Sequence, residues 1–260
     1  FAALWPDGTV CCALNRHGFW IKTNDGLSSM SLPPKQGLYD PANEHDACGI
    51  GFVAHIKGRK SHDIVQQGLK ILVNLDHRGA VGADPLVGDG AGILIQMPDA
   101  LMREEATRLG FALPAIGSYA VGMFFLPRNE TARAVARSIV ERFVTAEGQT
   151  ILGWREVPVD RTGIGTAVLG REPYITQLFI GRGANCADTD AFERKLFVAR
   201  KQIENAVREI VGRKEPGGIE QFYIPSLSSR TIVYKGLLLA HQVGSFYADL
   251  GDKRLVSALA

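Results

Sequence analysis

This chain of 260 residues lacks the features that define several classes of protein. Its longest apolar runs, such as residues 236–240, are far shorter than the roughly 20 residues that a membrane-spanning helix needs. It has no dense basic block and a net charge of only +2, so nucleic acid and anionic membranes are not predicted as partners. Its first residues also lack the charged and apolar regions of a signal peptide.

Cysteine is scarce as well. Four cysteines in a chain of this length do not form a disulfide framework, and no CxxC or His/Cys zinc spacing is present. The segment Glu44-His45-Asp46-Ala47-Cys48 contains groups that can bind metals, but no second cluster of ligands follows it. We therefore predict no metal site, and cysteine usage of this kind is typical of a reducing cytoplasm.

What is present is an ordinary globular composition, with 46% hydrophobic and 22% charged residues. Strand-like and helical patterns alternate in groups and not as strict strand–helix–strand units, which favours a layered α+β fold over a doubly wound parallel sheet. The expected strands are residues 49–56, 93–97, 119–126, 150–157, 174–180, 222–224 and 231–234. The expected helices are residues 64–75, 102–109, 129–143 and 190–211, with caps expected at residues 61–63, at Asn129, and at Asp188 or Asp190. The apolar residues expected to face inward on the last two helices are Ala132, Val135, Ala136, Ile139, Val140 and Phe143, and Phe192, Leu196, Ala199, Ile203, Val207 and Ile210.

The chain divides into three parts by pattern. Residues 1–29 contain scattered turn signals and no sustained period, and we expect them to be a leader of doubtful origin, either upstream or misassigned sequence. Met30 has the appearance of a translation start, so residues 30–47 are expected to be a propeptide-like leader. Residues 48–260 are the expected domain.

Cys48 is the most informative residue, because it opens the apolar strand pattern of residues 49–56. If the chain is cut before it, its new α-amine (pKa about 7.7–8.0) lies beside its thiol (pKa about 8.5), and one residue supplies both base and nucleophile. In an uncut chain, Cys48 is a small buried apolar residue. The sequence of this segment alone favours the second interpretation, in which Cys48 is a small buried apolar residue.

Two further motifs follow Cys48. The run Gly88-Asp89-Gly90-Ala91-Gly92 is not predicted to bind a nucleotide, because it follows a helix and leads into a strand, the reverse of a phosphate-binding loop. We expect its glycines to let backbone pack closely around a neighbouring active residue, although a simple tight turn is the alternative. His77-Arg78-Gly79 has the composition of a helix C-cap, and the functional alternative is an arginine that points toward an amide or anionic substrate.

The segment from about residue 39 onward resembles the N-terminal domain of the glutamate synthase large subunit, a class II glutamine amidotransferase domain. The matching residues are Asp40-Pro41, the run 44–52, His77-Arg78-Gly79-Ala80, Asp84, the run 88–93, Pro158-Val159, and the runs 177–180, 222–224, 228–236 and 255–258. These motifs are specific in combination and extend over most of the chain.

The resemblance implies a four-layer αββα N-terminal nucleophile hydrolase fold in which the leader is removed and Cys48 becomes the first residue. Cys48 would be catalytic and form a γ-glutamyl thioester with L-glutamine. Arg78, Gly79, Asp89 and Gly90 would line its pocket, with no metal there. Ammonia would pass to a synthase domain with FMN and an iron–sulfur cluster that converts 2-oxoglutarate to glutamate. A small reductase subunit or ferredoxin would supply electrons.

The family also has an arginine motif for the glutamine carboxylate and an asparagine–glycine oxyanion motif, and we find neither before Ala260. We therefore expect a domain truncated at its C-terminal end, with weak or no activity alone, because the loss of one oxyanion donor costs about a hundred- to a thousandfold in rate. The alternatives are another class II amidotransferase, an unprocessed inactive domain, and a cysteine hydrolase with a histidine base.

Overall fold

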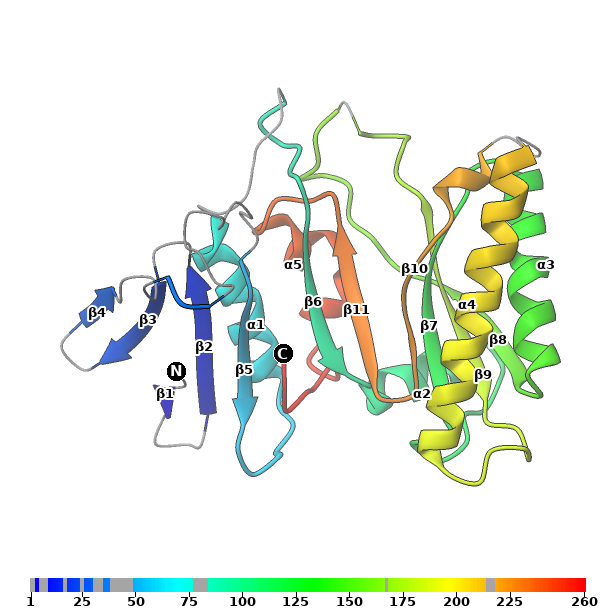
Figure 1. The fold of residues 1–260 in the computed structure, drawn as a ribbon, viewed down its shortest axis with the longest axis horizontal. Helices are drawn as coiled ribbons and strands as arrows, with labels where there is room; N and C mark the ends of the chain where they lie inside the picture. The colour runs from blue at the N-terminus through cyan, green and yellow to red at the C-terminus, as the bar shows by residue number, and fades with distance from the viewer. Residues whose placement is uncertain are drawn as a thin grey trace.

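The computed structural model describes residues 3–4, 9–15, 18–23, 26–29, 35–37, 49–76, 84–166, 168–213 and 218–260. Within them, strands and helices follow one another in groups (Figure 1), and this mixed helix-and-sheet content confirms the coarse α+β expectation. The strands are β1 (Ala3–Leu4), β2 (Thr9–Asn15), β3 (Gly18–Thr23), β4 (Gly26–Ser29), β5 (Gly51–His55), β6 (Ala91–Gln96), β7 (Tyr119–Leu126), β8 (Thr150–Glu156), β9 (Tyr174–Gly181), β10 (Tyr223–Ser228) and β11 (Thr231–Gly236). The α-helices are α1 (His62–Asn74), α2 (Asp99–Arg108), α3 (Glu130–Ala146), α4 (Thr189–Arg213) and α5 (Gln242–Phe246).

Strands β1 to β5 form one sheet, in the order β1-β2-β3-β4 with β5 also paired to β2, and a separate antiparallel sheet has the strand order β10-β7-β9-β8. Its strand β7 is buried at every position except Phe125, which is partly exposed, as the continuous apolar pattern of residues 119–126 predicts. Helices α3 and α4 cover one face of this sheet (Figure 1). Apart from Ala199, the predicted inward residues of both helices pack in one cluster with Phe124 and Leu178 of the sheet, and Ala199 is buried as well. This packing confirms the helical periodicity of the two segments.

Three helices begin at the capping residues that the sequence indicates. The side chains of Ser61, Asn129 and Asp188 each accept a hydrogen bond from a backbone N–H in the first turn of α1, α3 and α4. Such a bond satisfies an amide that has no partner inside the helix, so each cap fixes where the helix starts. Among the described helices, none is both long and apolar enough to cross a membrane.

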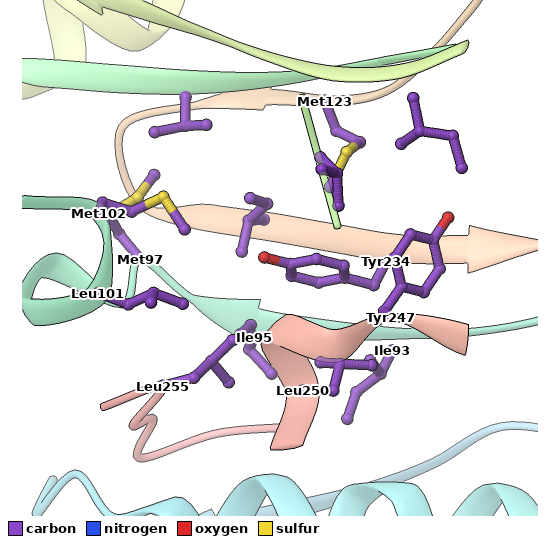
Figure 2. Close-up of a cluster of buried hydrophobic side chains, with 14 of the residues drawn as sticks. Ile93, Ile95, Met97, Leu101, Met102, Met123, Tyr234, Tyr247, Leu250 and Leu255 are labelled. Atoms are coloured by element: carbon purple, nitrogen blue, oxygen red, sulfur yellow. The ribbon is translucent and has the colours of Figure 1, made fainter. Parts of the chain in front are cut away.

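A further sheet is the antiparallel pair β6–β11, in register from Thr231 opposite Gln96 to Gly236 opposite Ala91. Its alternate residues Ile93, Ile95, Ile232 and Tyr234 are buried. They join Met123 of β7 and the segment that contains Tyr247, Leu250 and Leu255 in one hydrophobic core (Figure 2). The β10-β7-β9-β8 sheet and the β6–β11 pair are therefore held together by a shared apolar layer.

Strand β5, which follows Cys48 in the chain, lies between β2 and the last residues of the chain. Val53 exchanges two backbone hydrogen bonds of 2.9 Å with Ala260 on one side and is paired with Cys11 on the other. Helix α1 packs against this strand, with Ile64 and Ile71 buried beside Val53. The start of the strand is thus fixed from both edges and from one face.

Two features differ from the sequence-based expectation. The described residues of 9–29, a range read as turn-rich without a period, form the antiparallel strands β2, β3 and β4, with Thr23 paired to Gly26. The sequence analysis also missed α5, because five residues with a glycine inside are too few to show a helical period.

A buried ion pair connects the layers of the domain. Arg155 of β8 makes two hydrogen bonds of 2.7 Å with Asp249, and their side chains are only 2% and 3% exposed. The same guanidinium donates to Glu105 of α2 and to Gln177 of β9, both at 2.9 Å. Tyr234 of β11 donates its hydroxyl to Asp249 at 3.0 Å, and burial together with the charge of Asp249 raises the pKa of Tyr234. Nearly every polar atom of the pair therefore has a partner, as burial of charge requires.

We expect Asp249→Ala to lower the free energy of unfolding by about 3–5 kcal/mol, because it leaves a buried guanidinium without its main counter-charge. Asp190→Ala is the matched control, since Asp190 pairs with Arg230 where both side chains are more than half exposed. Asp190→Ala should lower the free energy of unfolding by less than about 1 kcal/mol. Urea unfolding of the two variants measures the difference, and equal losses would contradict a special role for the buried pair.

Candidate active site

The sequence-predicted site residues fall into two groups. Cys48, Arg78 and Gly79 lie outside the described residues, whereas Asp89 and Gly90 lie within them. Asp89 and Gly90 come just before β6 and are exposed at its start. The glycine run follows a helix and leads into a strand, as the sequence indicated.

A pocket of about 1140 Å³ lies beside Asp89, Gly90 and the start of β6. It is lined by Gly49, Ile50, Leu72, Leu75, Asp76, the run from Asp89 to Leu94, Phe125, Tyr223, Val233 and the run from Lys235 to Ala240. The pocket therefore contains the direct neighbour of Cys48 (Gly49), the last described residue before Arg78 (Asp76), and both Asp89 and Gly90. Described residues close in the chain to Cys48 and Arg78 thus line one cavity together with the glycine run.

The glycines of the Gly88–Gly92 run are required by close backbone contacts. A Cβ atom on Gly88 would stand 2.6 Å from the carbonyl oxygen of Leu238, and one on Gly92 would stand 2.4 Å from the Cβ of Lys235. Gly90 has a φ of 133°, a conformation that other residues rarely adopt. The run thus packs directly against β11 and residues 237–239. Its expected packing around a neighbouring active residue stays a prediction, because Cys48 lies outside the described residues.

The pocket wall formed by Phe125, Tyr223 and Lys235 contains a cation beside an aromatic ring. The ammonium of Lys235 donates a hydrogen bond of 2.7 Å to the hydroxyl of Tyr223 and lies 4.4 Å from the centre of its ring. The ring of Phe125 lies beside that of Tyr223, with the centroids 6.1 Å apart. This wall is amphipathic, while the wall formed by Ile50, Leu72 and Leu75 is apolar.

A second, smaller hollow of about 280 Å³ adjoins the first along β5. It is lined mainly by apolar groups, including Phe52, Ile71, Leu259 and Ala260, and it shares Gly49 and Ile50 with the larger pocket. The residues that directly follow Cys48 in the chain thus border open space on both sides.

The backbone of the pocket wall is anchored by a buried tyrosine. Tyr247 donates its hydroxyl to the carbonyl oxygen of Lys235 at 2.8 Å. Burial raises the pKa of Tyr247, so the hydroxyl stays protonated and remains a donor throughout the physiological pH range. Its ring stands edge-on to that of Tyr234, with the centroids 5.1 Å apart, which links the wall to the Arg155–Asp249 pair.

Sequence reasoning missed residues 237–240 as part of the pocket. The run Leu237-Leu238-Leu239-Ala240 has no reactive side chains and no turn signal. Its position in the pocket wall follows only from its contact with Gly88 in the structure. Lys235 was noticed only as part of a longer matching run. Its neighbour Gly236, the last residue of β11, is the one local signal available.

The donor groups of the site do not form a metal centre. Among residues 49–76, 84–166, 168–213 and 218–260, there is no cluster of three His, Cys, Asp or Glu side chains that could hold a metal ion. Asp76 and Asp89 line the pocket without a third ligand of this kind. These residues do not fit an iron–sulfur cluster either, which needs several thiolates.

Residues 48–260 match the family model of the class-II glutamine amidotransferases, and the chain belongs to that family. The match begins at Cys48 itself, at the start of the segment that leads into β5.

Curated relatives point to one branch of the family. The chain is 50% identical over 230 residues to the glutamate synthase [NADPH] large chain of Bacillus subtilis (strain 168), over 88% of this chain and 14% of that protein. It is 42% identical over 236 residues to the glutamate synthase [NADH] of Schizosaccharomyces pombe, over 88% of this chain and 11% of that protein. It is 38% identical over 238 residues to ferredoxin-dependent glutamate synthase 2 of Synechocystis, over 92% of this chain and 14% of that protein. The chain therefore spans only a small part of the length of these relatives.

We expect Gly88→Ala to destabilise the protein by about 1–3 kcal/mol, because the new methyl group would collide with the backbone of Leu238 and not with a movable side chain. Gly251→Ala is the control, since nothing lies within 4 Å of a Cβ at that position. Thermal unfolding of both variants provides the measurement. A Gly88→Ala variant as stable as the control would contradict the close packing of this run.

Proposed function

We propose that this chain is the glutaminase part of a glutamate synthase, which hydrolyses L-glutamine to glutamate and ammonia with Cys48 as the nucleophile. One observation carries the proposal: Gly49 and Asp76, the described neighbours of Cys48 and Arg78, line the same pocket as Asp89 and Gly90. The relatives support it, since all three compared above carry glutamate synthase names.

In the proposed reaction, the chain is cut before Cys48 and the freed α-amine takes the thiol proton. The thiolate attacks the side-chain amide carbon of glutamine, and the proton passes from the amine to the departing ammonia. Water then cleaves the γ-glutamyl thioester, which releases glutamate and restores the thiol. Glutamine and water are thus converted to glutamate and ammonia with no other reactant.

The remaining pocket residues have positioning roles in this proposal. Arg78 offers a guanidinium that can bind the amide or carboxylate oxygen of glutamine, and Gly79 allows the chain to turn beside it. Asp89 offers a carboxylate that can accept hydrogen bonds from the substrate ammonium group, and Gly90 supplies a backbone conformation that other residues rarely adopt. Effective catalysis depends on such groups being held in place before the substrate arrives.

The proposed fold is the four-layer αββα arrangement of N-terminal nucleophile hydrolases. Three packing relations support it: α3 and α4 on the outer face of the β10-β7-β9-β8 sheet, the apolar core shared by that sheet and β6–β11, and α1 against β5. In this arrangement, residues 1–47 precede the mature domain of residues 48–260.

The wider role of the protein is proposed from the relatives. Their names include NADPH, NADH and ferredoxin, so a small reductase subunit or ferredoxin is the proposed electron source for this enzyme. Ammonia would pass to a synthase domain with FMN and an iron–sulfur cluster, and no step of the glutaminase reaction is assigned to those groups. The free thiol of Cys186 suits the proposed location in a reducing cytoplasm.

We expect the purified natural protein that contains this chain to begin at Cys48 and to hydrolyse glutamine. Cys48→Ala should reduce the glutaminase rate by at least about a thousandfold, because the variant has no nucleophile. Intact mass, N-terminal sequencing and a glutamate-release assay test this prediction.

Cys186→Ala is the control, since Cys186 is a buried thiol that borders the α3–α4 cluster and should leave the rate unchanged. An active enzyme that retains residues before Cys48 would refute the amine as base. Such a result would favour a histidine base instead.

A further inference from the structure

The side chain of Gln242 forms three hydrogen bonds to three separate stretches of backbone. Its Oε1 accepts from the N–H of Leu239 at 2.8 Å. Its Nε2 donates to the carbonyl oxygens of Leu86 at 3.0 Å and Gly163 at 2.8 Å. The residue is only 2% exposed, so water does not replace these bonds if they are lost.

Two of these three stretches form walls of the candidate pocket. Leu239 belongs to the run 237–240, which lines the pocket, and Leu86 lies three residues before Asp89, which also lines it. Gly88 touches Leu238 directly, so the two walls meet backbone against backbone. Gln242 itself is not one of the residues that line the pocket.

The third stretch supports the other two from outside the pocket. A Cβ on Gly165 would stand 2.5 Å from a carboxylate oxygen of Asp84, so residues 163–165 lie directly against the start of residues 84–90. The carboxylate of Asp84 in turn accepts from the N–H of Leu86 at 2.9 Å. Gln242 thus binds the carbonyl oxygen of Leu86, and Asp84 binds its amide. With Leu86 fixed in this way and Gly88 packed against Leu238, the position of Asp89 is restricted as well.

The primary amide is the group suited to this place. It offers two N–H donors and one acceptor in a fixed plane, and the three backbone partners need two donors and one acceptor. A carboxylate lacks the donors, and a thioether such as methionine lacks the donors and a strong acceptor. Any replacement would leave buried backbone groups unpaired, and the loops would then move apart to reach water.

We propose that Gln242 is a positioning residue for glutamine binding: it fixes the Asp89 and Leu237–Ala240 walls of the pocket without touching the substrate. The inference rests on the proposed glutaminase function and adds a residue to its machinery.

The chain offers a matched control in Gln149. This glutamine is 4% exposed and its side-chain amide is likewise held by hydrogen bonds: it donates to the carbonyl oxygen of Glu147 at 2.7 Å and to the side-chain oxygen of Asn185 at 3.1 Å, and accepts from the N–H of Gly183 at 2.8 Å. It also makes longer contacts with the thiol of Cys186, at 3.6 Å and 3.7 Å. Its contacts lie beside the α3–α4 cluster, and it does not line the pocket. A purely structural role predicts the same behaviour for both residues.

The test compares Gln242→Met and Gln149→Met in the natural protein that contains this chain. Both variants should lose similar thermal stability. Only Gln242→Met should raise the KM for glutamine, by at least about tenfold, since misplacement of positioning groups by about 1 Å can cost about a hundredfold. Inactivation of Cys48 by a diazoketone analogue of glutamine should slow to the same degree, while alkylation by iodoacetamide, which does not need the pocket, should not change.

The outcomes are distinct. A KM and analogue-inactivation rate in Gln242→Met within twofold of those in Gln149→Met would overturn the inference. If Gln242→Met does not fold, Gln242→Glu, which keeps the acceptor for Leu239, is compared with Gln149→Glu by the same measurements. A wild-type protein without glutaminase activity would show that the proposed function itself is wrong, and Gln242 would then position no glutamine site.

Discussion

The buried pair of Arg155 and Asp249 is the interaction on which the rest of the structure depends. It joins α2, β8, β9, β11 and the segment after α5 through one guanidinium and one carboxylate. Charges removed from water must be fully paired, so these elements can occupy only one mutual arrangement without leaving a charge alone. The shared core of Figure 2 brings the sheets together by apolar contact, which has no direction, whereas the ion pair adds the directional contacts that fix their register.

The candidate site is built on this frame through backbone contacts. Tyr247 connects the frame to the carbonyl of Lys235, and Lys235 lies against Gly92 at the start of β6. Gly88 packs on Leu238. Gln242, which does not line the pocket, forms hydrogen bonds to Leu86 and Leu239 on the two sides of that contact. Small residues and backbone hydrogen bonds therefore hold the pocket, so the reactive groups are placed by parts of the chain that carry no chemistry themselves.

Much of the fold was predictable because its signals are local. The periods of α3, α4 and β7, and the caps Ser61, Asn129 and Asp188, depend on residues a few positions apart, and these predictions are confirmed. The glycine run packs closely against the backbone of residues 237–239, while its expected packing around an active residue stays a prediction. Helix α5 and the pocket run 237–240 were missed, since five-residue elements have no measurable period and leucines carry no functional signal. The role of Arg155 was equally invisible, because its partner lies 94 residues further along the chain.

The order of residues along the chain was enough to indicate which of them could carry chemistry: Cys48 at the head of an apolar strand, an arginine after a helix, and an acidic glycine run. All of them lie within the residues that match the class-II amidotransferase family. Only the tertiary structure decided that the segments around them meet in one pocket and that Gln242, a residue with no motif, joins the walls. The physical reason is that catalytic residue types are read from side-chain chemistry along the chain. A cavity, by contrast, exists only where sheets, loops and buried hydrogen bonds bring distant backbone together.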